Sequence, residues 1–133
     1  MIYLLDTNII SHLLRQHPQV MNRLQSVPMS ALFISAITHA EMMYGLAKKP
    51  QAVKLQRAVH ELLLRVQILP FDEEAAQTYG RLKAQAEQSG KSLAALDMLI
   101  AAHAVAADAV LVSNDAAFRH IQDLKWEDWT EAV

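Results

Sequence analysis

The chain has 133 residues, of which 53% are hydrophobic and 20% are charged, and its formal net charge at pH 7 is −2. This length suits one domain with a sizeable core, and the composition excludes a mainly disordered chain. Because the sequence contains no cysteine, disulfides, thiolate metal sites and cysteine nucleophiles are also excluded.

Short apolar runs alternate with helical patterns in the first half of the chain. The expected strands lie at 2–5 and 32–35, and the expected helices at 9–15, at 18–26, up to 48, and at 51–65. Thr7 or Asn8 is expected to cap the first helix, and Ser35 or Thr38 the third. Pro18 suits the first turn of the second helix.

The second half continues the alternation. Strands are expected at 66–69, 110–113 and 124–126, and helices after Asp72 to about 88, at 93–107 with Ser92 as the cap, and at 114–120. Strands that alternate with helices indicate parallel pairing, with helices on both faces of the sheet. We therefore expect one α/β domain over 1–133, with a mostly parallel sheet of about five short strands.

Four acidic residues each lie beside a predicted strand end or helix start: Asp6, Glu41, Asp97 and Asp115. Ligands of open α/β sheets bind beyond the carboxyl ends of the strands, which is where these side chains are expected. Converging carboxylates repel one another, and a hard divalent cation such as Mg²⁺ or Mn²⁺, which prefers oxygen ligands, compensates that repulsion. The four acids are therefore candidate metal-binding and catalytic residues.

Each acid also has an ordinary structural interpretation. Asp6 could turn the chain after its strand, Glu41 could be a solvated helix position, and Asp115 could favour a helix start through the helix dipole. Asp97 is the hardest to explain in this way, because it lies in an almost wholly apolar helix start, where a bare carboxylate is costly. Thr7 and Asn8 are expected to hold the Asp6 carboxylate in place.

Other chemistries find little support in the sequence. The six histidines form no i, i+4 pair, so a zinc site is not expected, and His12, His17, His60 and His120 are expected to be exposed or peripheral. There is no Gly-rich phosphate loop and no nucleophile elbow. A phosphotransfer domain is disfavoured because a single Asp6 follows the first strand, and a dehalogenase-type phosphatase because Asn8 stands where it needs a second Asp.

Five blocks carry a resemblance that spans nearly the whole chain. They are Leu5-Asp-Thr-Asn8, Ile37-Thr-His-Ala-Glu-Met-Met-Tyr-Gly45, Gly90-Lys-Ser-Leu-Ala-Ala-Leu-Asp97 with Ile100–Ala104, Leu111-Val-Ser-Asn-Asp115 with Phe118, and Leu124-Lys-Trp-Glu-Asp-Trp129. With these blocks in this order, the chain resembles the PIN-domain ribonucleases, specifically the VapC-type toxins of bacterial toxin–antitoxin pairs.

The resemblance implies a three-layer α/β/α fold and a Mg²⁺-dependent endoribonuclease, with Mn²⁺ as the alternative metal. It assigns metal binding first to Asp6 and Asp97 and then to Glu41 and Asp115. Thr7, Asn8, Ser113 and Asn114 become supporting polar residues. It also implies a tRNA or rRNA substrate, a homodimer, and a VapB-type antitoxin whose C-terminal tail covers the acidic groove.

Two positions depart from the family pattern. Ala94 stands where the family often has Gly, and Asp-Ala-Ala-Phe after Asn114 lacks the polar or basic residue that many relatives carry before Phe118. From sequence position alone, Lys48, Lys49, Lys91 and Arg119 are candidates to hold the RNA backbone. The alternative is a catalytically silent PIN-like module that only binds RNA or protein.

The N-terminus, with no basic region and an acid at position 6, does not resemble a signal peptide. The longest apolar stretch, 98–112, is interrupted by His103 and Asp108 and is too short to span a bilayer. A soluble, cytoplasmic protein without a membrane partner is therefore expected.

Overall fold

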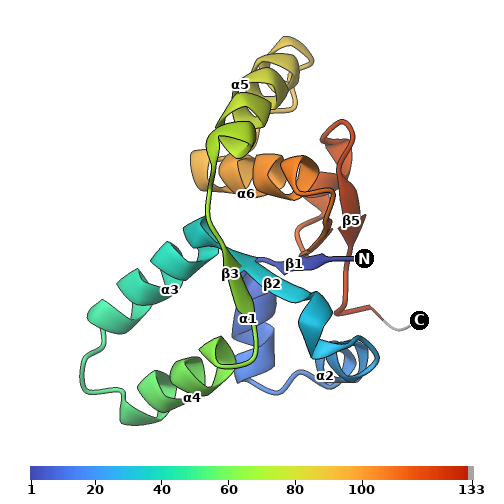
Figure 1. Ribbon diagram of the computed structural model, residues 1–133. Helices are drawn as coiled ribbons and strands as arrows, with labels where there is room; N and C mark the ends of the chain where they lie inside the picture. The colour runs from blue at the N-terminus through green and yellow to red at the C-terminus, as the bar shows by residue number, and fades with distance from the viewer. Residues whose placement is uncertain (132–133) are drawn as a thin grey trace.

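A computed structural model describes residues 1–131, and its centre is a five-stranded sheet in which all paired strands are parallel (Figure 1). The strands lie in the order β3-β2-β1-β4-β5. Their bounds are Tyr3–Leu5 (β1), Leu32–Ser35 (β2), Gln67–Leu69 (β3), Val110–Val112 (β4) and Lys125–Glu127 (β5). The first strand of the chain is therefore the central one, between β2 and β4.

Helices cover both faces of the sheet, which gives three layers. The α-helices are Thr7–Leu14 (α1), Pro18–Gln25 (α2), Ala36–Ala47 (α3), Val53–Leu63 (α4), Glu73–Gln88 (α5) and Ala95–Ala106 (α6), and the 3₁₀ helices are Met29–Ala31 (η1) and Ala116–His120 (η2). Figure 1 shows α5 and α6 on one side of the sheet, and α1, α2 and α4 on the other. The expected α/β/α architecture is confirmed.

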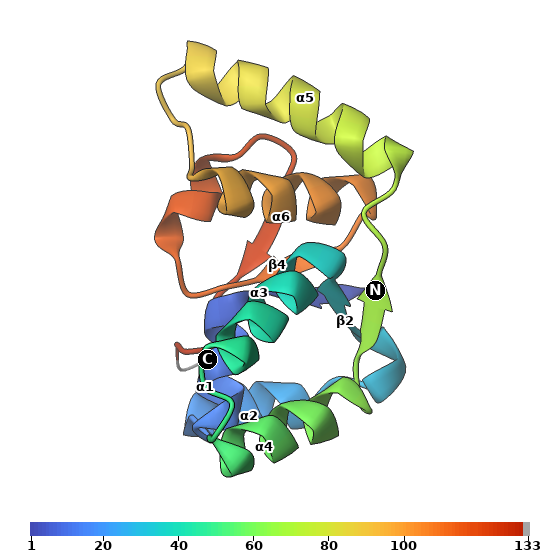
Figure 2. The same cartoon turned by 90° about the vertical axis from the view of Figure 1, so that its left-hand side faces the viewer.

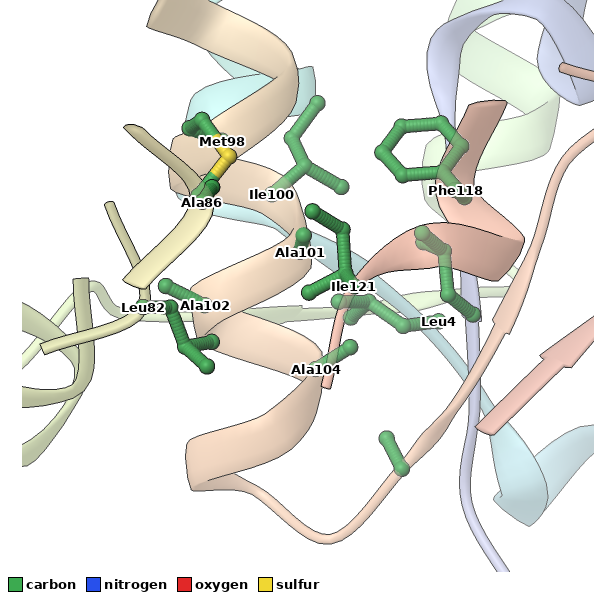
Figure 3. Close-up of a cluster of buried hydrophobic side chains, with 12 residues drawn as sticks. Leu4, Leu82, Ala86, Met98, Ile100, Ala101, Ala102, Ala104, Phe118 and Ile121 are labelled. Atoms are coloured by element: carbon green, nitrogen blue, oxygen red, sulfur yellow. The ribbon is translucent and has the colours of Figure 1, made fainter. Parts of the chain in front are cut away.

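Two hydrophobic clusters, one on each face, hold these layers together. Successive residues of β1 point to opposite faces, as the pleat of a strand requires, so Leu4 joins one cluster and Leu5 the other. The first cluster joins the sheet to α5, α6 and η2 through Leu82, Ile100 and Phe118, among others (Figure 3). Burial on both faces explains why the strands read as continuous apolar runs.

Most of the predicted elements are confirmed, with ends shifted by one or two residues. Two predicted caps and one predicted helix start are wrong. Asp6, not Thr7 or Asn8, caps α1, because its carboxylate accepts from the Ile9 N–H at 3.2 Å. The start of α6 lies at Ala95, after Ala94, which makes no side-chain cap, so Ser92 is not its cap.

The third wrong boundary is at η2. This helix starts at Ala116, after the N-cap Asp115, instead of at Asn114. Of the two candidates for α3, Ser35 is the cap. The 3₁₀ helix η1 was not predicted.

Within residues 1–131, no helix is long and apolar enough to cross a membrane. The predicted domain limits of 1–133 include 132 and 133, which lie outside the described residues.

Candidate functional site

The candidate site lies at the carboxyl edge of the sheet, where β1 and β4 end side by side. Leu5 pairs with Val112, and the Asp6 N–H donates to the Val112 carbonyl at 3.1 Å. The parallel register therefore places Asp6 next to Ser113, although 107 positions separate them in the sequence. Asp115 follows β4 as the N-cap of η2, Glu41 comes from α3, which follows β2, and Asp97 comes from the first turn of α6.

Asp6 is the most buried of the four acids, with 3% of its surface exposed. The pKa of its carboxyl is raised to about 7, chiefly by burial and to a smaller extent by the nearby charge of Asp97. Hydrogen bonds from the Ser113 side chain and from the Ile9 and Asn8 backbone oppose this rise. Without a cation, Asp6 therefore carries a proton through much of the neutral range.

Asp97 faces the charges of the remaining acids. Its pKa is raised by burial first, and then by the charges of Asp115 and Glu41. Since Asp97 also acts on Asp6, the other three predicted acids all lie within electrostatic reach of Asp97. The fold therefore gathers the residues that the sequence singled out.

Two of the acids already have hydrogen-bond partners. Glu41 accepts from the Thr7 hydroxyl at 2.6 Å, and Asp115 accepts from the Ala117 N–H at 3.0 Å. In residues 1–131, no three His, Asp or Glu side chains form a group ready to hold a metal ion.

The donor set nevertheless fits a hard divalent cation. The candidate ligands are all carboxylate oxygens, as Mg²⁺ and Mn²⁺ prefer. Burial and neighbouring carboxylates raise the pKa of both Asp6 and Asp97, and a cation would relieve both penalties.

Ser113 connects the predicted supporting residues. It is fully buried, and its hydroxyl oxygen accepts from the Asp115 N–H at 3.0 Å and from Asn8 Nδ2 at 3.4 Å. Asn8 Oδ1 in turn accepts from the Asn114 N–H at 3.3 Å. Asn8 therefore ties α1 to the end of β4, and Thr7, which was expected to support Asp6, holds Glu41 instead.

The C-terminal strand fixes Ser113 from the other side, a contact that no sequence motif predicted. The Ser113 N–H donates to the Glu127 carbonyl at 3.0 Å, and Trp126 Nε1 donates to the Ser113 carbonyl at 3.1 Å. The Glu127 carboxylate accepts from Arg23 at 2.7 Å and from Trp129 Nε1 at 3.0 Å. These bonds join α2, β5 and the edge that carries Asp6.

The candidate RNA-binding cations fall into two places. Lys48 and Lys49 line a groove of about 210 Å³ that also contains Thr7 and Glu41, and Lys48 Nζ lies 4.6 Å from the centre of the Tyr44 ring. Lys91 is exposed in the turn before α6, and Arg119 is exposed on η2. Figure 2 shows the turn before α6 and η2 on the same side of the molecule.

Sequence reasoning missed the role of two sets of histidines. His103 is buried, with its Nδ1 2.7 Å from Ser35 Oγ, and so connects α6 to the cap of α3. His12 and His17 are half-buried rather than exposed, with ring centres 5.1 Å apart, and His17 Nδ1 accepts from the Val20 N–H at the start of α2. Only the fold brings His103 to Ser35, whereas His17 stands directly before Pro18 at the start of α2, a local signal for an N-cap position.

The chain is similar to known proteins over nearly its full length. The PIN domain family model matches residues 3–124. Ribonuclease VapC1 of Haemophilus influenzae (strain R2866) is 34% identical over 134 residues, which cover 98% of this chain and 100% of that protein. Ribonuclease VapC2 of Rickettsia felis is 36% identical over 132 residues, covering 97% and 98%. The tRNA(fMet)-specific endonuclease VapC of Shigella flexneri is 26% identical over 129 residues, covering 96% and 98%.

Solved structures agree with these sequence matches. VapBC2 from Rickettsia felis bound to a promoter DNA fragment contains a chain with a TM-score of 0.89 and 34% identity, and the match covers 97% of this chain and 99% of that one. VapBC-1 from nontypeable Haemophilus influenzae gives a TM-score of 0.88 at 34% identity, covering 98% and 100%.

Proposed function

The chain belongs to the PIN domain family, among the VapC ribonucleases, and on this premise we propose that it is a metal-dependent endoribonuclease, the toxin of a toxin–antitoxin pair. The observation that carries the proposal is the gathering of Asp6, Glu41 and Asp115 around Asp97 at one sheet edge, where each of the three acts electrostatically with Asp97. A module that only binds RNA gains nothing from this repulsion between carboxylates.

In the proposed mechanism, Asp6 and Asp97 hold Mg²⁺, or Mn²⁺ as the alternative. When bound, the ion stabilises negative charge at the phosphate and makes water a stronger nucleophile near neutral pH. Glu41 and Asp115 orient water or a second ion, and Thr7 fixes Glu41 through its 2.6 Å hydrogen bond. The hydrogen bond between Asn8 and Ser113 holds the first turn of α1 against the end of β4, and the bond from the Asp115 N–H to Ser113 fixes the segment that follows β4. The reaction is hydrolysis of a phosphodiester bond without a covalent protein intermediate.

The substrate we propose is a structured cellular RNA, a tRNA or an rRNA, cut in the cytoplasm by a single domain over 1–133 that forms a homodimer. A tRNA-specific endonuclease among the relatives supports this substrate class. The proposed inhibitor is a VapB-type antitoxin, since similar chains occur in VapBC complexes. Its tail would cover the groove that contains Glu41, Lys48 and Lys49.

Cleavage of total cellular RNA by purified, antitoxin-free protein tests the proposal. The reactions contain Mg²⁺, Mn²⁺ or EDTA, and the Asp97→Asn protein serves as the control. Discrete fragments that require metal and disappear in the variant are expected, and their ends identify the target bond. If well-folded protein binds RNA but cuts none under any metal condition, the chain is the silent binding module instead.

A further inference from the structure

A second cavity, of about 250 Å³, lies apart from the four acids, between the end of α5 and the end of η2. Its polar lining consists of two amides, one hydroxyl and two basic side chains: Gln85, Gln122, Ser89, Lys91 and His120. None of these residues takes part in the proposed chemistry, and none of them holds one of the four acids in place.

The floor of this cavity belongs to the hydrophobic core. Leu82, Ala86 and Ile121 line it and are each at most 7% exposed (Figure 3). Because close-packed side chains hold these residues, the cavity has a rigid apolar base beneath a polar rim. A flat ring with hydrogen-bonding edges fits this combination better than a bare anion does, since an anion gains nothing from the apolar base.

Gln85, a residue of the cavity lining, has an amide oxygen without a partner. This oxygen is buried and accepts no hydrogen bond from residues 1–131. Because buried polar groups are nearly always paired, rotation of the Gln85 amide towards the cavity would let the oxygen accept from a donor outside the chain. The amino and imino N–H groups of nucleobases are such donors, and Gln side chains pair with base edges through both amide atoms.

The cavity also lies close enough to the acids for one RNA strand to reach both. Asp115 caps η2 and His120 ends it, and a 3₁₀ helix rises about 2 Å per residue, which separates the two residues by roughly 10 Å. Lys91 precedes α6, whose first turn carries Asp97. An RNA strand cut at the acids would therefore bring a nucleotide close to the cavity, with Lys91 and His120 beside its phosphates.

We propose that this cavity binds one unpaired nucleotide of the substrate RNA, next to the cleaved bond. Gln85 and Gln122 contact the edge of the base, the floor of Leu82, Ala86 and Ile121 contacts its face, and Lys91 contacts a phosphate. This inference rests on the proposed ribonuclease function and adds a position at which the enzyme selects its target. Sequence-specific recognition of RNA commonly uses such unstacked, single-stranded bases.

The test compares Gln85→Met, which keeps the side-chain length but removes the amide, with Gln88→Met, a matched control at an exposed position of α5 outside the cavity. The target RNA is the one that the total-RNA cleavage identifies. Binding is measured in EDTA by fluorescence anisotropy with a labelled oligonucleotide of that target, in proteins that also carry Asp97→Asn. Cleavage kinetics are measured with Asp97 intact.

We expect Gln85→Met to weaken binding about tenfold, equivalent to about 1.4 kcal/mol, and to raise KM while kcat stays near the wild-type value. Gln88→Met should match the wild type in both assays. Gln122→Met, an exposed substitution that removes the second amide of the cavity and leaves the core intact, should also weaken binding, so the test survives if Gln85→Met does not fold.

Wild-type affinity and KM in folded Gln85→Met and Gln122→Met proteins, with an active wild-type enzyme, would overturn the nucleotide site alone. If the Gln85→Met protein lost its affinity for the antitoxin but kept its affinity for RNA, the cavity would be a binding site for the protein partner. That result would also overturn the nucleotide site. A wild type that neither binds nor cuts RNA would remove the proposed function, and the nucleotide site with it.

Discussion

The Thr7 hydroxyl donates a 2.6 Å hydrogen bond to the Glu41 carboxylate, which joins the first turn of α1 to the middle of α3. The bond fixes the one candidate acid that lies in the middle of a long helix. Because the acceptor is a charged group, its loss is expected to cost about 1.5–3 kcal/mol where the charge must be oriented.

Thr7→Val should therefore reduce RNA cleavage by at least about tenfold, because Glu41 is no longer held while the side-chain volume is almost unchanged. Thr7→Ser, which keeps the hydroxyl, should retain most of the activity. The measurement is kcat/KM on the identified target, with the thermal midpoint as a folding control. Equal activity of the valine and serine variants would show that Thr7 does not orient Glu41.

The raised pKa of Asp6 predicts how the metal-free protein responds to pH. The unfolded chain loses this proton near pH 4, whereas the folded chain keeps it up to about pH 7. Between these values the folded state binds more protons than the unfolded state, so stability is full below pH 4 and falls as the pH rises towards 7. The shift sets an upper bound of roughly 4 kcal/mol on this loss.

Asp6→Asn should remove this pH dependence while its side-chain oxygen still caps α1. In EDTA, the variant should melt several degrees above the wild type at pH 8 and close to it at pH 4.5, and it should cut no RNA. Differential scanning calorimetry at the two pH values measures the effect. A wild type that is more stable than Asp6→Asn at pH 8 in EDTA would contradict the conclusion that burial of the charged Asp6 carboxylate destabilises the fold.

Addition of a divalent cation should restore the stability that the fold loses when the buried Asp6 carboxylate becomes charged. Mg²⁺ or Mn²⁺ that binds only the folded protein raises its stability by about 2.7 kcal/mol at a hundredfold excess over Kd. The melting temperature of the wild type should rise with Mn²⁺ concentration, and that of Asp97→Asn should rise much less. An equal rise in both proteins would mean that the ion binds elsewhere.

His103 gives a pH dependence of opposite sign. Burial lowers its pKa, although Asp72 and the Pro70 carbonyl oppose the shift. Above about pH 6.5 the ring is neutral in both states and stability is full, and as the pH falls below that value the unfolded chain takes up the proton first and the fold loses stability. His103→Gln should flatten the loss between pH 7 and pH 5, as measured by urea denaturation. An unchanged slope in the variant would exclude His103 as its source.

Trp126 does not belong to the acidic edge, but its substitution should still lower the rate of RNA cleavage. Trp126→Phe removes the 3.1 Å bond to the Ser113 carbonyl but keeps an aromatic ring in the strand. We expect kcat to fall about threefold to tenfold with little change in KM, and the affinity for Mn²⁺ to fall with it, because Ser113 contacts Asp6 and Asp115. Lys125→Met, an exposed substitution in the same strand, is the control. A change in KM alone would show that Trp126 contacts RNA instead.

The strands and the four acids were predictable because each leaves a local signal. The runs at 2–5 and 32–35 are apolar throughout, as strands buried on both faces must be, and Asp97 is conspicuous in an apolar helix start. The partners of these acids were not predictable. Thr7 meets Glu41 rather than Asp6 because the helix that Asp6 caps turns Thr7 towards α3, and only the tertiary arrangement of α1 and α3 decides this.

The order of the strands in the sheet could not be predicted from the sequence either. Hydrophobic patterns give the same strands for many orders, and nothing local to β1 indicates that it pairs with both β2 and β4. The predicted caps at Thr7 or Asn8 and at Ser92, and the predicted helix start at Asn114, were wrong for a related reason. Several polar residues stand near each boundary, and the packing of the helix decides where it begins, so that α6 begins after Ala94 without a side-chain cap.

The central position of β1 has a consequence during synthesis on the ribosome. Asp6 is made before its neighbour strand β4 and the Ser113 that holds it, which follow more than 100 residues later. A nascent chain therefore contains Asp6, Glu41 and Asp97 before the acidic edge can close. If the chain is the proposed toxin, a molecule is inactive until β4 has been made, and the antitoxin is needed from that point on.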